Sequence, residues 1–198
     1  DGKFILKAIG KGVEEIVQNN GTLTNEEVFW NTFTSVTKIK QEEIEPEFIK
    51  FYETRFDLIN TGRQSIHMIQ AVSLLKEKGY RLILATNPLF PSIATEKRIK
   101  WAGLNKENFE WITTYENSSY AKPNPSYYKE IIDKLKLDVT QCLMVGNDVK
   151  EDCAITSLGI PVYLINDYLL NKHNLEITCP CSSSLEFLEY VKNLPNAK

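Results

Sequence analysis

Two aspartates at the end of a predicted strand have the spacing that most clearly indicates chemistry. The apolar strand predicted at 142–146 runs directly into Gly146-Asn147-Asp148, and Asp152 stands four residues after Asp148, in the first turn of a helix predicted over 150–158. Carboxylates held at this spacing suit Mg²⁺, a hard cation that takes one or two carboxylates and retains several waters. Capping of the following helix by Asp148 is the structural alternative.

Two other predicted strand ends carry groups that can bind phosphate. Thr86 and Asn87 follow the strand 81–85, where a hydroxyl and backbone N–H groups in a turn can hold a phosphate oxygen. Thr-Asn-Pro is also ordinary turn chemistry. Lys122 lies in Lys122-Pro123-Asn124-Pro125, beyond the strand predicted at 110–113, and a lone lysine is usually a solvated surface residue. A hydroxyl, a lysine and an acid pair each follow a successive predicted strand. All three together are much less expected by chance than any one of them alone.

The second part of the sequence alternates short apolar strands with helices. This order predicts a doubly wound parallel sheet of the α/β class, covered by helices on both faces. In such sheets the ligand lies beyond the carboxyl ends of the strands. One predicted helix ends at Gly79, and three others cover 92–101, 126–135 and 150–158. The predicted strands cover 81–86, 110–113, 142–146 and 162–165.

The first 61 residues contain helical periods and no convincing strand. Ile5, Ile9 and Ile16 recur at helical spacing, and Thr24 with Glu27 three residues later forms a capping-box signature for a second helix. A third helix is predicted to start near Pro46, because proline favours the first turn. We therefore expect a helical cap subdomain at 1–61 and an α/β core at 62–198.

Composition indicates a globular protein with a small-molecule partner. The chain has 198 residues, 42% of them hydrophobic, and 23 basic against 26 acidic residues leave a net charge of -3. No basic field is present to attract nucleic acid or an anionic membrane, and no apolar run approaches the roughly 20 residues needed to span a bilayer. We expect a cytoplasmic protein whose cysteines, Cys142, Cys153, Cys179 and Cys181, are reduced thiols, with a redox or metal role for the Cys179-Pro180-Cys181 pair as the alternative. The oligomeric state is left open.

In order and spacing, residues 63–170 resemble the haloacid dehalogenase-like (HAD) hydrolase superfamily, which consists mostly of Mg²⁺-dependent phosphatases with a Rossmannoid fold. The Thr86-Asn87 turn looks like its second motif, Lys122 with the following Pro-x-Pro looks like its third, and Gly146-Asn147-Asp148 through Asp152 looks like its fourth. The helical segment at the start resembles the cap that this superfamily inserts after its first strand.

The resemblance implies hydrolysis of a phosphate monoester through an aspartyl-phosphate. Asp148 would hold Mg²⁺, and Asp152 would orient the metal shell as a further ligand or pair with Lys122. The resemblance implies that Lys122 and Asp152 are catalytic residues. Lys122 would neutralise the charge of the phosphoryl group and of the nucleophile. Thr86 and the backbone of Asn87 would bind a phosphate oxygen, and the partner would be a small phosphorylated molecule.

The sequence lacks the first motif of the family, a strand ending in Asp-x-Asp that carries the nucleophile. We expect the folded protein to contain a further central strand, because without it the strands ending at Thr86 and Gly146 would leave buried N–H and C=O groups unpaired, each costing about 1–3 kcal/mol. One continuous sheet built from the predicted strands alone would contradict this expectation. Two alternatives remain: an inactive relative that binds a phosphorylated ligand or a protein partner, and a general doubly wound nucleotide-binding or receiver-type domain.

Overall fold

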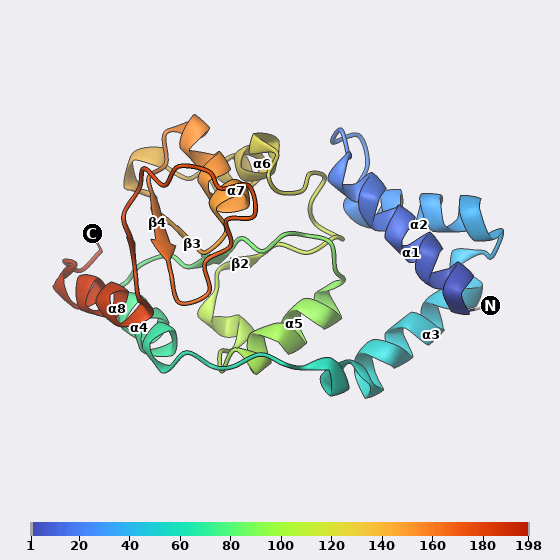
Figure 1. Ribbon diagram of the computed structural model, residues 1–198, viewed down its shortest axis with the longest axis horizontal. Helices are drawn as coiled ribbons and strands as arrows, with labels where there is room; N and C mark the ends of the chain where they lie inside the picture. Colours follow the sequence, from blue (N-terminus) through green and yellow to red (C-terminus); the bar gives the residue numbers. More distant parts are fainter. Residues whose placement is uncertain (1, 198) are drawn as a thin grey trace. The chain divides into compact units, whose positions relative to one another are not determined.

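The structure is a computed structural model that describes residues 2–197, and Figure 1 traces their helices and strands in chain order. The chain folds into two compact units. The first comprises Asp1–Arg63, Leu84–Lys106 and Ile112–Ala121, and the second comprises Gln64–Ile83, Glu107–Trp111 and Lys122–Lys198. The division into a cap at 1–61 and a core at 62–198 stays a prediction. No helix within residues 2–197 is long and apolar enough to cross a membrane.

The first unit is helical, with α1 (Gly2–Val17), α2 (Asn25–Thr37), α3 (Gln41–Thr54), the 3₁₀ turn η1 (Phe56–Ile59) and α5 (Ser92–Trp101). The predicted capping box starts α2: Glu27 N–H donates to Thr24 Oγ1 over 3.2 Å, and Thr24 N–H donates to Glu27 Oε2 over 2.7 Å. The predicted start of the third helix near Pro46 is wrong, because Pro46 lies inside α3. Glutamine and glutamates at 41–43 favour helix and the dipole of its first turn, so the helix begins before the proline.

The core of the first unit is aromatic and contains one fully buried amide. Phe29, Trp30 and Phe33 on α2 pack with Phe48, with ring centroids 5.1–6.3 Å apart. Asn25, at the start of α2, donates from Nδ2 to the carbonyl oxygens of Tyr120 and Pro88 at 3.0 and 3.3 Å, and its Oδ1 accepts from Asn19 at 2.8 Å. These bonds tie the helix start to two loops, because a buried amide left unpaired would be costly.

The second unit contains a parallel sheet of order β3-β4-β5. The strands are β3 (Met144–Gly146), β4 (Val162–Ile165) and β5 (Cys181–Ser182), and both pairings are parallel. Helices α4 (Ile66–Glu77) and α8 (Ser184–Asn193) lie side by side (Figure 1) and bury a shared apolar core. The remaining elements of this unit are α6 (Pro125–Leu135), the 3₁₀ turn η3 (Val139–Gln141), α7 (Val149–Asp152) and the 3₁₀ turn η4 (Cys153–Leu158).

The α/β class with parallel strands is confirmed, while several details differ from the predictions. The helix expected over 150–158 is one α-helical turn, α7, continued by η4. β5 and α8 were not predicted. The strands β1 (Ile83–Leu84) and β2 (Trp111–Ile112), with the 3₁₀ turn η2 (Lys106–Asn108) before β2, form a separate two-stranded sheet. One continuous sheet would have contradicted the expected further strand. The strands described within residues 2–197 form two separate sheets, so that contradiction does not arise, and the further strand stays a prediction.

Candidate active site

A buried ion pair lies at the end of β3 in the second unit. Lys122 Nζ is 2.6 Å from Asp152 Oδ1, and the two side chains are only 6% and 7% exposed. The other oxygen of this carboxylate, Oδ2, accepts from the backbone N–H groups of Asn147 and Asp148 at 2.8 and 2.9 Å. Removing two charges from water is costly unless geometry and further hydrogen bonds compensate. Here both carboxylate oxygens are satisfied, so Asp152 holds Lys122 in one place.

Gly146 is what allows Asp152 to occupy this position. A Cβ atom built on Gly146 would lie 2.1 Å from Asp152 Oδ2 and 2.4 Å from its Cγ. A side chain on the last residue of β3 would therefore displace the carboxylate. The sequence shows Gly146 as part of a motif, but the close approach that requires a glycine is visible only in the folded unit.

Asp148 does cap the helix, as the structural alternative proposed. Its Oδ1 accepts from the N–H groups of Lys150 and Glu151, both at 2.9 Å, at the start of α7. The cap uses one of the two carboxylate oxygens, and the side chain is half-buried. Capping and metal binding are therefore compatible in geometry.

The carboxylates of the site could hold Mg²⁺ only if the protein supplied few ligands and water supplied the others. Within residues 2–197, no group of three or more His, Cys, Asp or Glu side chains is arranged to hold a metal ion. Asp148 contributes one oxygen beyond its cap, while both oxygens of Asp152 already have hydrogen-bond partners. One carboxylate with several waters is a usual Mg²⁺ arrangement, so Asp148 fits, and direct ligation by Asp152 stays a prediction.

Two tyrosines of α6 line the Lys122 side chain. The sequence analysis did not identify them as residues of the site. Lys122 Nζ lies 5.9 Å and 5.6 Å from the ring centroids of Tyr127 and Tyr128. The Tyr128 hydroxyl donates to the Glu151 carbonyl at 2.7 Å. Burial, and then the charge of Asp152, raises the pKa of Tyr128 far above its ordinary value, so it stays a neutral donor. In the sequence these tyrosines read only as part of an apolar helix face.

Thr86 and Asn87 belong to the first unit, unlike the other predicted site residues. Both are half-buried. The Thr86 carbonyl accepts from Thr113 Oγ1 at 2.7 Å, and the Asn87 carbonyl accepts from Leu89 N–H at 2.9 Å. The structure thus brings together Lys122, Asp148 and Asp152 in the second unit, and phosphate binding by Thr86 and Asn87 stays a prediction.

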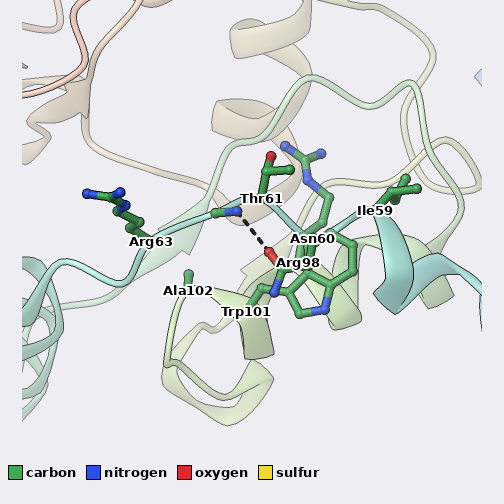
Figure 2. Close-up of a pocket in the computed structure, with 8 residues that line it drawn as sticks. Ile59, Asn60, Thr61, Arg63, Arg98, Trp101 and Ala102 are labelled. Carbon is green, nitrogen blue, oxygen red and sulfur yellow. Dashed lines mark hydrogen bonds between the residues drawn. The ribbon is translucent and has the colours of Figure 1, made fainter.

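A cavity of about 250 Å³ lies in the first unit, and none of the predicted site residues lines it. Residues 59–63 and the end of α5 line it, and Figure 2 shows the Arg98 side chain rising beside Thr61 while Arg63 points away. The dashed line marks the 2.9 Å bond from Gly62 N–H to Asn60 Oδ1. The two arginines do not converge, so the cavity has no built anion site.

Comparison with known proteins identifies the family. A sequence model of haloacid dehalogenase-like hydrolases matches residues 5–155, about three quarters of the chain. The chain belongs to this hydrolase family. All the predicted site residues of this HAD-like hydrolase, Thr86, Asn87, Lys122, Asp148 and Asp152, lie inside the matched range.

Relatives and solved structures agree with this assignment. The HAD-like hydrolase is 27% identical over 112 residues to glyceraldehyde 3-phosphate phosphatase from Methanothermobacter thermautotrophicus, which covers 52% of this chain and 48% of the relative. The chain thus aligns with about half the length of that phosphatase. It also shares its fold with a HAD phosphatase from Thermococcus onnurineus, at a TM-score of 0.56 and 16% identity, covering 99% of this chain and 91% of the other.

A second protein of similar fold is the putative HAD-hydrolase YfnB from Bacillus subtilis, in a structure bound to magnesium. Its TM-score is 0.57 at 22% identity, covering 97% of this chain and 82% of YfnB. These likenesses confirm the HAD-like fold.

Proposed function

We propose that this hydrolase removes phosphate from a small phosphate monoester in a Mg²⁺-dependent reaction through an aspartyl-phosphate, with the nucleophilic aspartate supplied by residues outside this sequence. The observation that carries the proposal is the buried Lys122–Asp152 pair beside Asp148, in a chain of the HAD-like hydrolase family.

Lys122 is proposed to bind the transferring phosphoryl group and to neutralise its charge. Its ammonium group is nearly excluded from water, where a charge acts more strongly than at the surface. Asp152 accepts a hydrogen bond from it, and the rings of Tyr127 and Tyr128 lie within 6 Å of it. A cation held in advance costs no reorganisation when charge develops in phosphoryl transfer.

Asp148 is proposed to hold the metal ion through the carboxylate oxygen that its cap leaves over. Mg²⁺, when bound, supplies positive charge to the phosphate oxygens. The cap itself fixes the carboxylate at the start of α7. Asp152 is proposed to act mainly as a positioning residue, because it fixes Lys122 and, through the N–H groups of Asn147 and Asp148, the backbone beside the metal ligand.

The proposed substrate is a small phosphorylated molecule, with no nucleic acid and no membrane partner. The net charge of -3 offers no broad basic surface, so a phosphate would be held by local groups. Thr86 and the backbone of Asn87 are proposed to bind a phosphate oxygen. The relative that is named for glyceraldehyde 3-phosphate supports a small phosphate ester as the substrate class.

The test is Mg²⁺-dependent hydrolysis of p-nitrophenyl phosphate by the full-length protein and its Asp148→Asn variant. Asparagine caps a helix about as well as aspartate, so α7 should survive while the metal ligand is weakened. Asp138→Asn is the matched control, because Asp138 caps η3 in the same way, by accepting from Thr140 N–H at 3.0 Å, and is not one of the residues assigned to the site. We expect Asp148→Asn to raise the Mg²⁺ concentration needed for half-maximal rate and to lower turnover.

Equal rates for the wild type and Asp148→Asn would overturn the site assignment. A full-length protein that binds phosphate in a Lys122-dependent way without any turnover would instead support the inactive, ligand-binding relative.

A further inference from the structure

The loop that follows β4, residues 166–170, lies against the turn that carries Asp148. Leu170 N–H donates to the Asn147 carbonyl at 2.7 Å, and Val149 N–H donates to the Leu170 carbonyl at 2.9 Å. These bonds make a parallel bridge between Asp148 and Leu170. The backbone on both sides of the proposed metal ligand is therefore bonded to this loop, which we call the brace loop.

A side chain adds a third bond between the brace loop and the turn. Asn147 Nδ2 donates to the Tyr168 carbonyl at 2.8 Å, and the backbone N–H of the same asparagine donates to Asp152 Oδ2 at 2.8 Å. Asn147 thus connects the brace loop with the carboxylate that pairs with Lys122. A displacement of the loop would therefore reach Asp152 as well as Asp148.

Asp167 fixes the brace loop to the start of α8. Its Oδ2 accepts from the Ser184 N–H at 2.6 Å, and its Oδ1 accepts from Ser184 Oγ at 3.0 Å. Ser184 is only 3% exposed, so these bonds anchor an exposed loop to a buried part of the unit. The bond from the Ser184 N–H, more than any other contact, holds the pKa of Asp167 below its ordinary value, so the carboxylate is ionised at neutral pH.

His67 on α4 supports the same anchor. Its Nδ1 lies 3.3 Å from Ser184 Oγ. A hydroxyl has one hydrogen and a carboxylate only accepts, so the Ser184 hydrogen points to Asp167, and Nδ1 of His67 must be the donor to Ser184. The resulting chain of hydrogen bonds joins α4 to α8 and to the brace loop, all within the second unit.

The helix α8 already has a cap of its own. Ser183 and Glu186 form a capping box, in which the Ser183 N–H and hydroxyl donate to Glu186 Oε2 at 2.9 and 2.7 Å, and Ser183 Oγ accepts from the Glu186 N–H at 3.3 Å. Two acidic side chains therefore bind the first turn of one helix, but Glu186 does so from within the helix and Asp167 from the brace loop. Glu186 is thus a matched comparison for Asp167.

We propose that Asp167 is a positioning residue of the phosphatase site, which acts by fixing the brace loop against the turn that carries Asp148. The effect on the metal rests on the proposed function, whereas the attachment of the loop does not. Replacing residues that orient metal ligands typically lowers metal affinity or activity by about 10–100-fold. Asp167 acts through backbone bonds and not on the ligand itself, so we expect a change of about 10-fold, at the lower end of this range.

The first measurement is hydrogen exchange of the full-length protein, followed by mass spectrometry. We expect Asp167→Ala to speed exchange in peptides that contain Val149 and Leu170, whose N–H groups make the bridge. Glu186→Ala is the matched control and should speed exchange at the start of α8 only. Unchanged exchange at Val149 and Leu170 in Asp167→Ala would overturn the role of the brace loop. Equal acceleration in both variants would overturn it too, because the effect would then come from α8.

The second measurement is the dissociation constant of Mn²⁺, followed by electron paramagnetic resonance, because Mn²⁺ prefers the same oxygen ligands as Mg²⁺. We expect Asp167→Ala to raise this constant about 10-fold. Asp167→Asn should restore most of the wild-type affinity, because its amide oxygen can accept from the Ser184 N–H while its NH₂ group donates to the hydroxyl. Glu186→Ala should leave the constant unchanged, and an equal rise in Glu186→Ala and Asp167→Ala would contradict the proposal.

Asp148→Asn separates this inference from the proposed function. If Asp148→Asn weakens Mn²⁺ binding and Asp167→Ala does not, the positioning role of Asp167 is overturned while the metal site stands. If Asp148→Asn binds Mn²⁺ as tightly as the wild type, the proposed metal site is contradicted, and with it the effect of Asp167 on the metal. Hydrogen exchange then still decides whether Asp167 fixes the brace loop against the turn.

Discussion

The two units treat buried charge in opposite ways. In the second unit Lys122 Nζ lies 2.6 Å from Asp152 Oδ1, and the remaining carboxylate oxygen, Oδ2, accepts from two backbone N–H groups. In the first unit Glu26 lies among like charges. Burial raises its pKa most, and the charges of Glu116 and Glu45 raise it further. No ion pair involving these three glutamates is found within residues 2–197.

The charges of Lys122 and Asp152 compensate each other, whereas the charge of Glu26 has no opposite charge paired with it among the described residues. A buried ion pair is costly to assemble and is weak support for stability, so its presence beside Asp148 points to a task in the site. Glu26 is only half-buried, which limits the cost of its charge. We therefore expect substitutions to have large effects in the second unit and small, pH-dependent effects in the first.

The largest effect is expected for Lys122→Met. The variant leaves the Asp152 charge buried without its partner, which should destabilise the protein by about 3–5 kcal/mol and remove phosphatase turnover. The free energy of unfolding is measured in urea, alongside hydrolysis of p-nitrophenyl phosphate.

Lys129→Met is the matched control for that experiment. Lys129 pairs with Asp133 at 2.7 Å, but both side chains are 62% exposed, so its loss should cost less than about 1 kcal/mol. Equal losses from the two variants would show that distance rather than burial decides the strength of these pairs, and the contrast drawn above would fail.

An intermediate effect is expected for Gly146→Ala. The added methyl group would stand 2.1 Å from Asp152 Oδ2, so the carboxylate must shift and weaken its bonds to Asn147 and Asp148. Overpacking of this kind costs about 1–3 kcal/mol. We expect lower stability in urea and reduced turnover.

Gly10→Ala is the control for the glycine substitution. Gly10 lies inside α1, and a Cβ atom there would meet nothing within 4 Å. Alanine should stabilise this helix by about 0.5–1 kcal/mol. An unchanged turnover and stability in Gly146→Ala would mean that Asp152 does not need its present position.

The smallest effect is expected for Glu26→Gln, and it should depend on pH. The pKa of Glu26 in the folded state lies above its ordinary value of 4.5, so the folded state holds this proton more tightly than the unfolded state. The resulting stability is fully present below pH 4.5 and is lost as pH rises through the raised pKa. At pH 7 the carboxylate is thus unfavourable, and glutamine should raise Tm by about 1–3 °C.

Melting curves at pH 7 and pH 4 measure this difference, which should shrink at the lower pH. Glu47→Gln, an exposed position of α3, serves as the control and should leave Tm unchanged at both pH values. A lower Tm for Glu26→Gln at pH 7 would show that Glu26 makes a favourable contact instead.

Much of the fold follows from local patterns. The capping box at Thr24 and the strand at Val162–Ile165 were predicted within a residue, because caps and apolar runs are local signals. β5 was missed because a strand of two residues, Cys181–Ser182, has no detectable period. The helix after Asp148 was overestimated, because its continuation as the 3₁₀ turn η4 leaves no mark in residue types.

The sequence by itself determined which chemical groups follow which strands: Thr86 and Asn87, Lys122, and Asp148 with Asp152. That information lies in the order of residues along the chain. Only the tertiary structure decided that Lys122 pairs with Asp152, 30 residues away, and that Gly146 must lack a side chain. The physical reason is that pairing and close approach are set by packing between segments distant in the chain, which no local spacing records.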